Sequence, residues 1–180
     1  MAEMKGKFIS LACSLLETKP DAKAAALTSV KHMTGKEWNE LDPEGWYDTR
    51  VLESVFKAIM DHTSPLLGWA AIKVIGRGVY PTIQSTVGLP THLTSPVEFV
   101  KFEAQGFLDN HRGADVVPRK IIKAEPGMVV MEAPSPGYNC SFIEGVYEGI
   151  LIMCDIRNGK VKQSRCVTKG DPTCEYVIAW

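Results

Sequence analysis

Apolar residues recur at helical spacing along the first half of the chain. The clearest pattern spans residues 48–61, where one stripe of a helix collects Val51, Leu52, Val55, Phe56, Ile59 and Met60. Residues 20–32 are rich in alanine and other strong helix formers, and Pro20 suits a first helical turn, where its missing N–H costs no hydrogen bond. Both segments therefore predict helices.

Two further segments in this half predict helices. Residues 65–76 are mostly apolar, and Gly76 and Gly78 are expected to end the helix. Ser95 is followed by a proline and, three residues after the serine, by a glutamate. This capping box predicts the start of a helix over residues 96–109.

The second half of the chain changes to β-strand signals. Two runs rich in β-branched and apolar residues, 119–124 and 128–133, flank a Glu-Pro-Gly turn sequence and predict a hairpin. Residues 138–153 are apolar on most faces and predict a buried helix. Within this helix, Gly145 and Gly149 lie four residues apart and indicate a close approach to the sheet beneath.

A second hairpin is predicted at the end of the chain. Residues 161–168 and 173–180 flank the turn Lys169-Gly170-Asp171-Pro172. The order of elements predicts an α+β fold, in which a helical part, residues 1–113, packs on a four-stranded antiparallel sheet formed by two hairpins with an intervening helix in residues 114–180. A length of 180 residues is normal for one domain and allows a buried core, so we expect a single ligand-binding domain over 1–180.

The composition excludes several classes of protein. Hydrophobic residues make up 45% and charged residues 23% of the chain, which argues against disorder. The net charge is −1 and no long basic run occurs, so neither nucleic acid nor a membrane is an expected partner. The apolar stretch from Phe8 to Leu16 is too short to span a membrane and lacks a signal-peptide cleavage site. We therefore expect a cytoplasmic protein with reduced cysteines.

Three of the five cysteines are placed to meet in the fold. Cys166 and Cys174 lie symmetrically about Gly170, so the hairpin places them opposite each other on one face. Cys140 lies near the start of the preceding helix, which is expected to pack on that face. Three thiolates and one further donor form a tetrahedral zinc site, whereas buried free thiols or a Cys166–Cys174 disulfide are the alternatives. The remaining cysteines are expected to be packing residues: Cys13 and Cys154.

The cysteine-bearing stretch resembles a known family. Residues 137–178 are similar to the 4-vinyl reductase domain, in which a cysteine opens a glycine-containing helix and two more flank a Gly-Asp-Pro-like turn, here Cys140, Cys166 and Cys174. The resemblance implies a fold related to haem nitric-oxide-binding sensor domains and to a vesicle-tethering subunit. In the sensor domains of phenol- and xylene-responsive activators such cysteines hold a structural zinc, so the resemblance implies zinc here. It is vague for the helical half of the chain.

One position departs from the zinc-bearing relatives, which often place a glutamate three residues before the middle cysteine. Here that position is Gln163. A neutral amide is a poor zinc ligand, so the fourth donor stays open between water and Glu144, which follows Cys140 by one helical turn. A solvated helix residue is the alternative interpretation of Glu144.

Other chemistry finds less support in the sequence. No two histidines are spaced four residues apart, and three of them fall near predicted helix ends, where an imidazolium suits the helix dipole: His32, His62 and His111. A haem needs an axial His or Cys, and the Tyr-x-Ser-x-Arg motif of the haem-sensing relatives is absent. No catalytic triad, P-loop or Rossmann glycine pattern occurs. The sequence thus favours a binding protein over an enzyme without deciding between them.

Large aromatic residues in the helical half are candidates for an apolar pocket between helices and sheet: Trp46, Tyr47, Trp69 and Phe99. Ordinary core packing is the alternative. We expect a sensor or regulatory domain that binds a small apolar or aromatic ligand, forms a homodimer by analogy with related folds, and signals through a partner protein. The alternatives are a tetrapyrrole- or haem-binding carrier, sensor or reductase-related enzyme, and a structural adaptor without a ligand.

Overall fold

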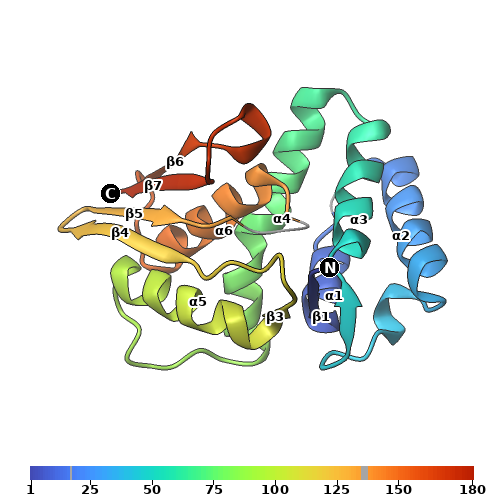
Figure 1. Ribbon diagram of the computed structural model, residues 1–180, viewed down its shortest axis with the longest axis horizontal. Helices are drawn as coiled ribbons and strands as arrows, with labels where there is room; N and C mark the ends of the chain where they lie inside the picture. Colours follow the sequence, from blue (N-terminus) through green and yellow to red (C-terminus); the bar gives the residue numbers. More distant parts are fainter. Residues whose placement is uncertain (17, 135–137) are drawn as a thin grey trace.

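The computed structural model describes residues 1–16, 18–134 and 138–180 (Figure 1). The α-helices in these segments are α1 Gly6–Ser14, α2 Pro20–Thr34, α3 Arg50–Asp61, α4 Pro65–Thr86, α5 Pro96–Asn110 and α6 Cys140–Met153. The strands are β1 Glu3–Lys5, β2 Trp46–Asp48, β3 His111–Arg112, β4 Lys120–Glu125, β5 Met128–Glu132, β6 Lys160–Arg165 and β7 Glu175–Ala179. Short 3-10 turns cover Trp38–Glu40 and Val167–Lys169.

The predicted α+β fold is confirmed. Strands β4 to β7 form an antiparallel sheet in the order β4-β5-β7-β6, which consists of the two predicted hairpins joined through β5 and β7. One face of this sheet is buried through alternate residues, among them Met131, Tyr176 and Ile178, as a period of two requires. Helix α6 packs on this face, where the rings of Tyr147 and Tyr176 meet edge to face at 5.7 Å.

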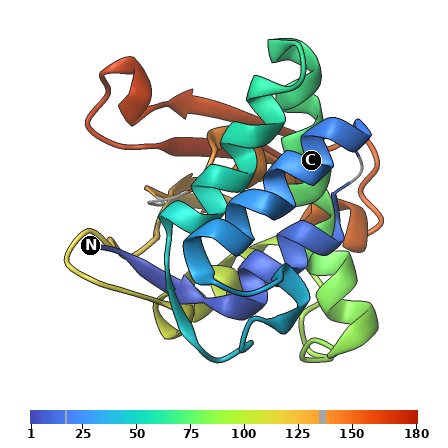
Figure 2. The ribbon, with the colours of Figure 1, turned by 90° about the vertical axis from the view of Figure 1, so that its right-hand side faces the viewer.

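Helices separate this sheet from the start of the chain. In Figure 1, α4 and α6 lie between the four-stranded sheet on one side and α1, α2 and α3 on the other. Figure 2 shows α1, α2 and α3 as one layer that faces the viewer. Although α4 has 22 residues, no helix in the described segments is both long and apolar enough to cross a membrane.

The close approach predicted for the glycines of α6 exists, but its partner is helix α4 and not the sheet. A Cβ atom added to Gly145 would lie 2.1 Å from the carbonyl oxygen of Lys73, and one added to Gly149 would lie 2.4 Å from that of Arg77. Gly76 on α4 makes the reciprocal contact with α6. The two helix backbones therefore touch, because neither carries side-chain atoms at these positions.

The predicted end of α4 at Gly76 and Gly78 is wrong, since the helix continues to Thr86. Both glycines act as contact points: Gly76 lies against α6, and a Cβ on Gly78 would lie 3.0 Å from the Leu15 side chain. The helix even contains Pro81, which cannot donate to the carbonyl of Arg77. Packing against two neighbours thus outweighs the local helix-breaking tendency of these residues.

A small second sheet was not predicted. Strands β2, β1 and β3 pair antiparallel in that order and tie three distant segments together. Met4, in the central strand, is fully buried. Strands of two or three residues are too short to carry a period-two pattern, which explains why the sequence offers no signal for them.

Candidate functional site

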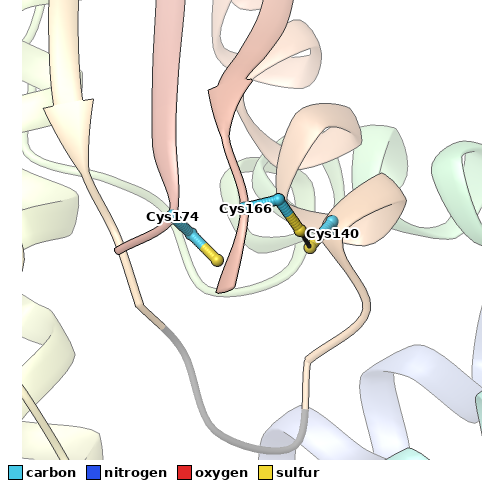
Figure 3. A group of neighbouring side chains, drawn as sticks. All are labelled: Cys140, Cys166 and Cys174. Carbon is cyan, nitrogen blue, oxygen red and sulfur yellow. Dashed lines mark hydrogen bonds between the residues drawn. The ribbon is translucent and has the colours of Figure 1, made fainter. Parts of the chain in front are cut away.

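The structure brings three cysteine side chains together where α6 begins and the last hairpin ends. Cys140 is the first residue of α6, Cys166 follows β6, and Cys174 precedes β7. Figure 3 shows their sulfur atoms pointing toward one another. The three sulfurs lie within 4.8 Å of one another, and those of Cys140 and Cys166 are 3.5 Å apart.

Local hydrogen bonds hold the hairpin end in place. Arg165 pairs with Glu175, which is the register that the symmetry about Gly170 predicts. The carboxylate of Asp171 accepts the backbone N–H of Cys166 at 2.8 Å, and the Asp171 N–H donates to the Cys166 carbonyl at 3.1 Å. Gly170 takes a left-handed conformation with φ of 93°. Cys166 and Cys174 consequently sit just beyond the strand ends, on either side of a fixed turn.

The start of α6 is fixed as well. The side chain of Asn139 caps the helix by accepting the N–H of Ser141 at 2.9 Å. Cys140 therefore occupies the first helical position, where the unpaired N–H groups of the helix terminus favour negative charge. Cap and turn together aim thiols from separate segments at one point.

The environment treats the three thiols differently. Burial raises the pKa of the Cys140 thiol and raises that of Cys174 to about 11. Burial also acts on Cys166, but hydrogen bonds from Thr168 and Cys140 outweigh it, so the pKa of Cys166 is lowered. The Thr168 hydroxyl lies 2.9 Å from the Cys166 sulfur. Cys166 is thus the thiol that ionises first.

The spacing of the sulfurs suits a metal ion. Zinc–sulfur bonds of about 2.3 Å in a tetrahedron separate neighbouring sulfurs by about 3.8 Å. The separation of 3.5 Å between Cys140 and Cys166, and the limit of 4.8 Å for the whole group, are close to this value. Small side-chain adjustments would bring all three thiolates to bonding distance.

Neither residue considered as a fourth donor is free to join. Glu144 is held by the Lys73 ammonium at 3.2 Å and by the backbone N–H of Gln163 at 3.1 Å, so it is not a solvated surface residue. The Gln163 amide donates to the Tyr176 hydroxyl at 3.4 Å. Within the described segments, no aspartate, glutamate or histidine joins the thiols in a potential metal-binding group.

A cavity of about 800 Å³ adjoins the cluster. Its wall combines the thiols of Cys140 and Cys166 with apolar side chains from α3, α4 and the segment before α6: Phe56, Met60, Trp69 and Tyr138. Charged residues from α3 and the hairpin also line it: Arg50, Glu53, Lys57 and Lys169. A smaller cavity of about 230 Å³ is lined by Cys140, Cys174 and Ile143. Cys140 lies on the wall of both cavities.

The four aromatic residues proposed from the sequence do not meet at one place. Trp69 lines the larger cavity and is 53% exposed. Trp46 lies between two cations, with Lys5 Nζ 4.4 Å and the Arg112 guanidinium 4.3 Å from its ring. The remaining two are absent from the walls of both cavities: Tyr47, whose hydroxyl accepts the N–H of Asp42, and Phe99, which is buried in α5.

Sequence reasoning missed Phe56, Met60 and Tyr138 as cavity residues. Phe56 and Met60 belong to the apolar stripe that predicts α3, and this stripe gives no sign of which members face the protein core. Tyr138 precedes α6, only two residues from Cys140. Its closeness to a candidate ligand was the available signal.

None of the histidines lines either cavity. His111 is the most deeply buried of the four, and both of its ring nitrogens are engaged, Nδ1 with the Phe107 carbonyl at 2.8 Å and Nε2 with the Tyr138 hydroxyl at 2.9 Å. Burial lowers the pKa of His111 to about 4, against the opposing effect of the Phe107 carbonyl. A haem in the larger cavity would therefore find a thiol, and not an imidazole, as its protein ligand.

No known sequence family matches the chain, and no curated protein is similar to it. Solved structures are similar. A Cs H-NOX mutant matches with a TM-score of 0.72 and 17% identity over 98% of this chain and 96% of its own. The unliganded Fe(II) H-NOX protein of K. algicida matches with a TM-score of 0.66 and 12% identity, covering 98% and 96%. An H-NOX mutant of T. Tengcongensis gives 0.67 and 16%, covering 97% and 95%. The chain therefore has the fold of the haem-binding H-NOX domains.

Proposed function

We propose that the chain is a sensor or regulatory domain that binds a small apolar or aromatic molecule in the larger cavity. The observation that carries the proposal is a cavity of about 800 Å³ with apolar walls and a cluster of thiols at one side. Ligand sites commonly have about 300–1,000 Å³, with mostly apolar walls and few convergent polar groups. A binding role, in a cytoplasmic protein of the 4-vinyl reductase domain type, fits this arrangement better than catalysis.

The thiol cluster is proposed to hold a metal ion, with zinc as the first candidate. Three sulfurs at near-tetrahedral spacing, contributed by a helix start and a hairpin end, support this assignment. A bound ion would link two elements that otherwise meet through a few hydrogen bonds. The metal would then stabilise the wall of the ligand cavity.

Haem is the second candidate, and the comparisons favour it over the zinc-bearing sensor. The similar solved structures include an H-NOX protein with Fe(II) and one studied for haem distortion. The residues present fit a thiolate-held haem, because Cys140 or Cys166 would supply the axial ligand on the cavity wall. Bound there, haem would supply gas binding or electron transfer. The same thiols serve either group, so zinc and haem exclude each other.

One preparation distinguishes these proposals. The purified chain is analysed by absorbance, elemental analysis and native mass spectrometry. A Soret band with one iron per chain supports haem, whereas one zinc per chain without a Soret band supports the thiol-bound zinc. A preparation that lacks both metals, and takes up neither on addition, contradicts both metal proposals. A mass increment that disappears on unfolding identifies a retained organic ligand.

The adaptor alternative and the oligomeric state are separate questions. An adaptor without a ligand predicts no cavity, so the larger cavity favours the binding proposal. Exposed apolar residues at the start of α4, Leu66 and Leu67, offer a surface for a second copy or a partner protein. Homodimerisation is tested by sedimentation velocity, and Leu66→Ser should shift a dimer toward monomer.

A further inference from the structure

We infer that the thiol cluster binds its metal ion through three protein ligands and leaves one coordination position for a small molecule from the larger cavity. The expected molecule has an apolar or aromatic body and one nitrogen or sulfur donor, such as an imidazole or a thiolate. This inference rests on the proposed metal site, and it names the class of ligand that the site recognises.

The first observation is the chemistry around the sulfurs. Among the residues that the structure describes, only the three cysteines come together as a potential metal-binding group. Glu144 is held by Lys73 and by the backbone of Gln163. The neutral Gln163 side chain interacts with the Cys140 thiol, at a place where a carboxylate would complete a four-ligand site.

The second observation is what adjoins the cluster. Cys140, Cys166 and Gln163 all line the larger cavity. Structural zinc sites are closed by four protein ligands, whereas sites with three protein ligands keep the fourth position for water or a substrate. A donor atom near these thiols would belong to a molecule whose body occupies the cavity.

The cavity wall defines the rest of that molecule. Phe56 on α3 and Trp69 on α4 line the same space as the thiols. These side chains favour an aromatic or aliphatic body, and nitrogen and sulfur donors suit an ion that is already bound by thiolates. Hydrophobic contact and coordination would thus select the ligand together.

The test uses the full chain loaded with Co²⁺, whose visible d–d bands respond to a change of ligand. The chain is titrated with imidazole and, separately, with 4-phenylimidazole. We expect saturable changes of the bands with both compounds. Affinity for 4-phenylimidazole should be about tenfold higher or more, because its phenyl ring leaves water on entering an apolar cavity.

Two variants separate coordination from cavity packing. Gln163→Glu should retain cobalt and lose the response to both imidazoles, because the new carboxylate takes the open position. Trp69→Ala changes only the cavity wall, where this side chain is half exposed and thus tolerant of truncation. It should retain the response to imidazole and lose most of the preference for the phenyl compound.

The outcomes are distinct. Cobalt bands that ignore both imidazoles, or a Gln163→Glu variant that responds as strongly as the parent chain, would overturn the inference and leave the metal site standing. A chain that holds no zinc as purified and takes up no cobalt contradicts the proposed metal site itself.

Discussion

Replacing Gly145 by alanine tests the contact between α4 and α6 on which both halves of the molecule depend. The new Cβ would lie 2.1 Å from the Lys73 carbonyl oxygen and 2.9 Å from the Arg77 nitrogen, where ordinary contact begins at 3.4 Å. Both neighbours are backbone atoms, so no rotamer change relieves the clash. The helices must instead move apart by about 1 Å, which loosens the close packing of the interior.

The expected magnitude follows from two opposing effects. Overpacking of this kind costs about 1–3 kcal/mol, and a backbone neighbour places the substitution toward the upper end. Alanine regains about 1 kcal/mol of helix propensity relative to glycine. The free energy of unfolding should therefore fall by about 2 kcal/mol, which lowers the melting temperature of a chain this size by roughly 4–8 °C.

Gly106 provides the matched control. It also lies inside a helix, α5, but a Cβ at this position meets no atom within 4 Å. Gly106→Ala should therefore raise the free energy of unfolding by up to about 1 kcal/mol. Urea unfolding followed by circular dichroism measures both variants. A Gly145→Ala chain as stable as the parent, or an equal loss in Gly106→Ala, would refute the reasoning.

Three further substitutions test other parts of the structure. Because the pKa of buried His111 is about 4 and an unfolded histidine titrates near 6.5, the unfolded state binds more protons between these values. The free energy of unfolding should fall by up to about 3 kcal/mol as the pH drops from 6.5 to 4, and His111→Gln should remove this part of the slope in urea titrations at several pH values. Cys166→Ser should abolish metal uptake and lower the melting temperature of the metal-loaded chain, whereas Cys154→Ser, outside the cluster, should change neither; equal behaviour of the two variants would contradict the site. Glu103→Ala should cost about 3–5 kcal/mol, since it removes the carboxylate that pairs with the buried Arg119 guanidinium; calorimetry that finds a loss under about 1 kcal/mol would contradict this.

The four-stranded sheet was predictable because its information is local. Each hairpin combines period-two strands with a turn, and the second turn contains Gly170 at a positive φ. The symmetry of Cys166 and Cys174 about that glycine carried enough geometry to expect facing thiols. The three-stranded sheet and the continuation of α4 past Gly76 depend on contacts between distant segments, which local patterns do not encode.

The cavity was harder to predict for a different reason. Periodicity shows that Phe56 and Met60 lie on the apolar stripe of α3, but the same stripe serves a core and a ligand wall equally well. Trp69 was named because of its size, and it lines the cavity, whereas Trp46 lies between two cations on the small sheet. Residue type indicated a candidate in each case, and only the tertiary arrangement separates them.

The position of the cavity also bears on how binding would be transmitted. One wall comes from α3 and α4 and the other from the start of α6 and the end of the last hairpin. Helix α6 touches α4 through backbone atoms at Gly145, so these walls cannot move independently at that point. A ligand that contacts both walls, or a metal ion that ties Cys140 to the hairpin, must favour the arrangement in which α6 is seated on α4. Ligand and metal should therefore raise the free energy of unfolding together, and Gly145→Ala should weaken binding although it lies outside the cavity.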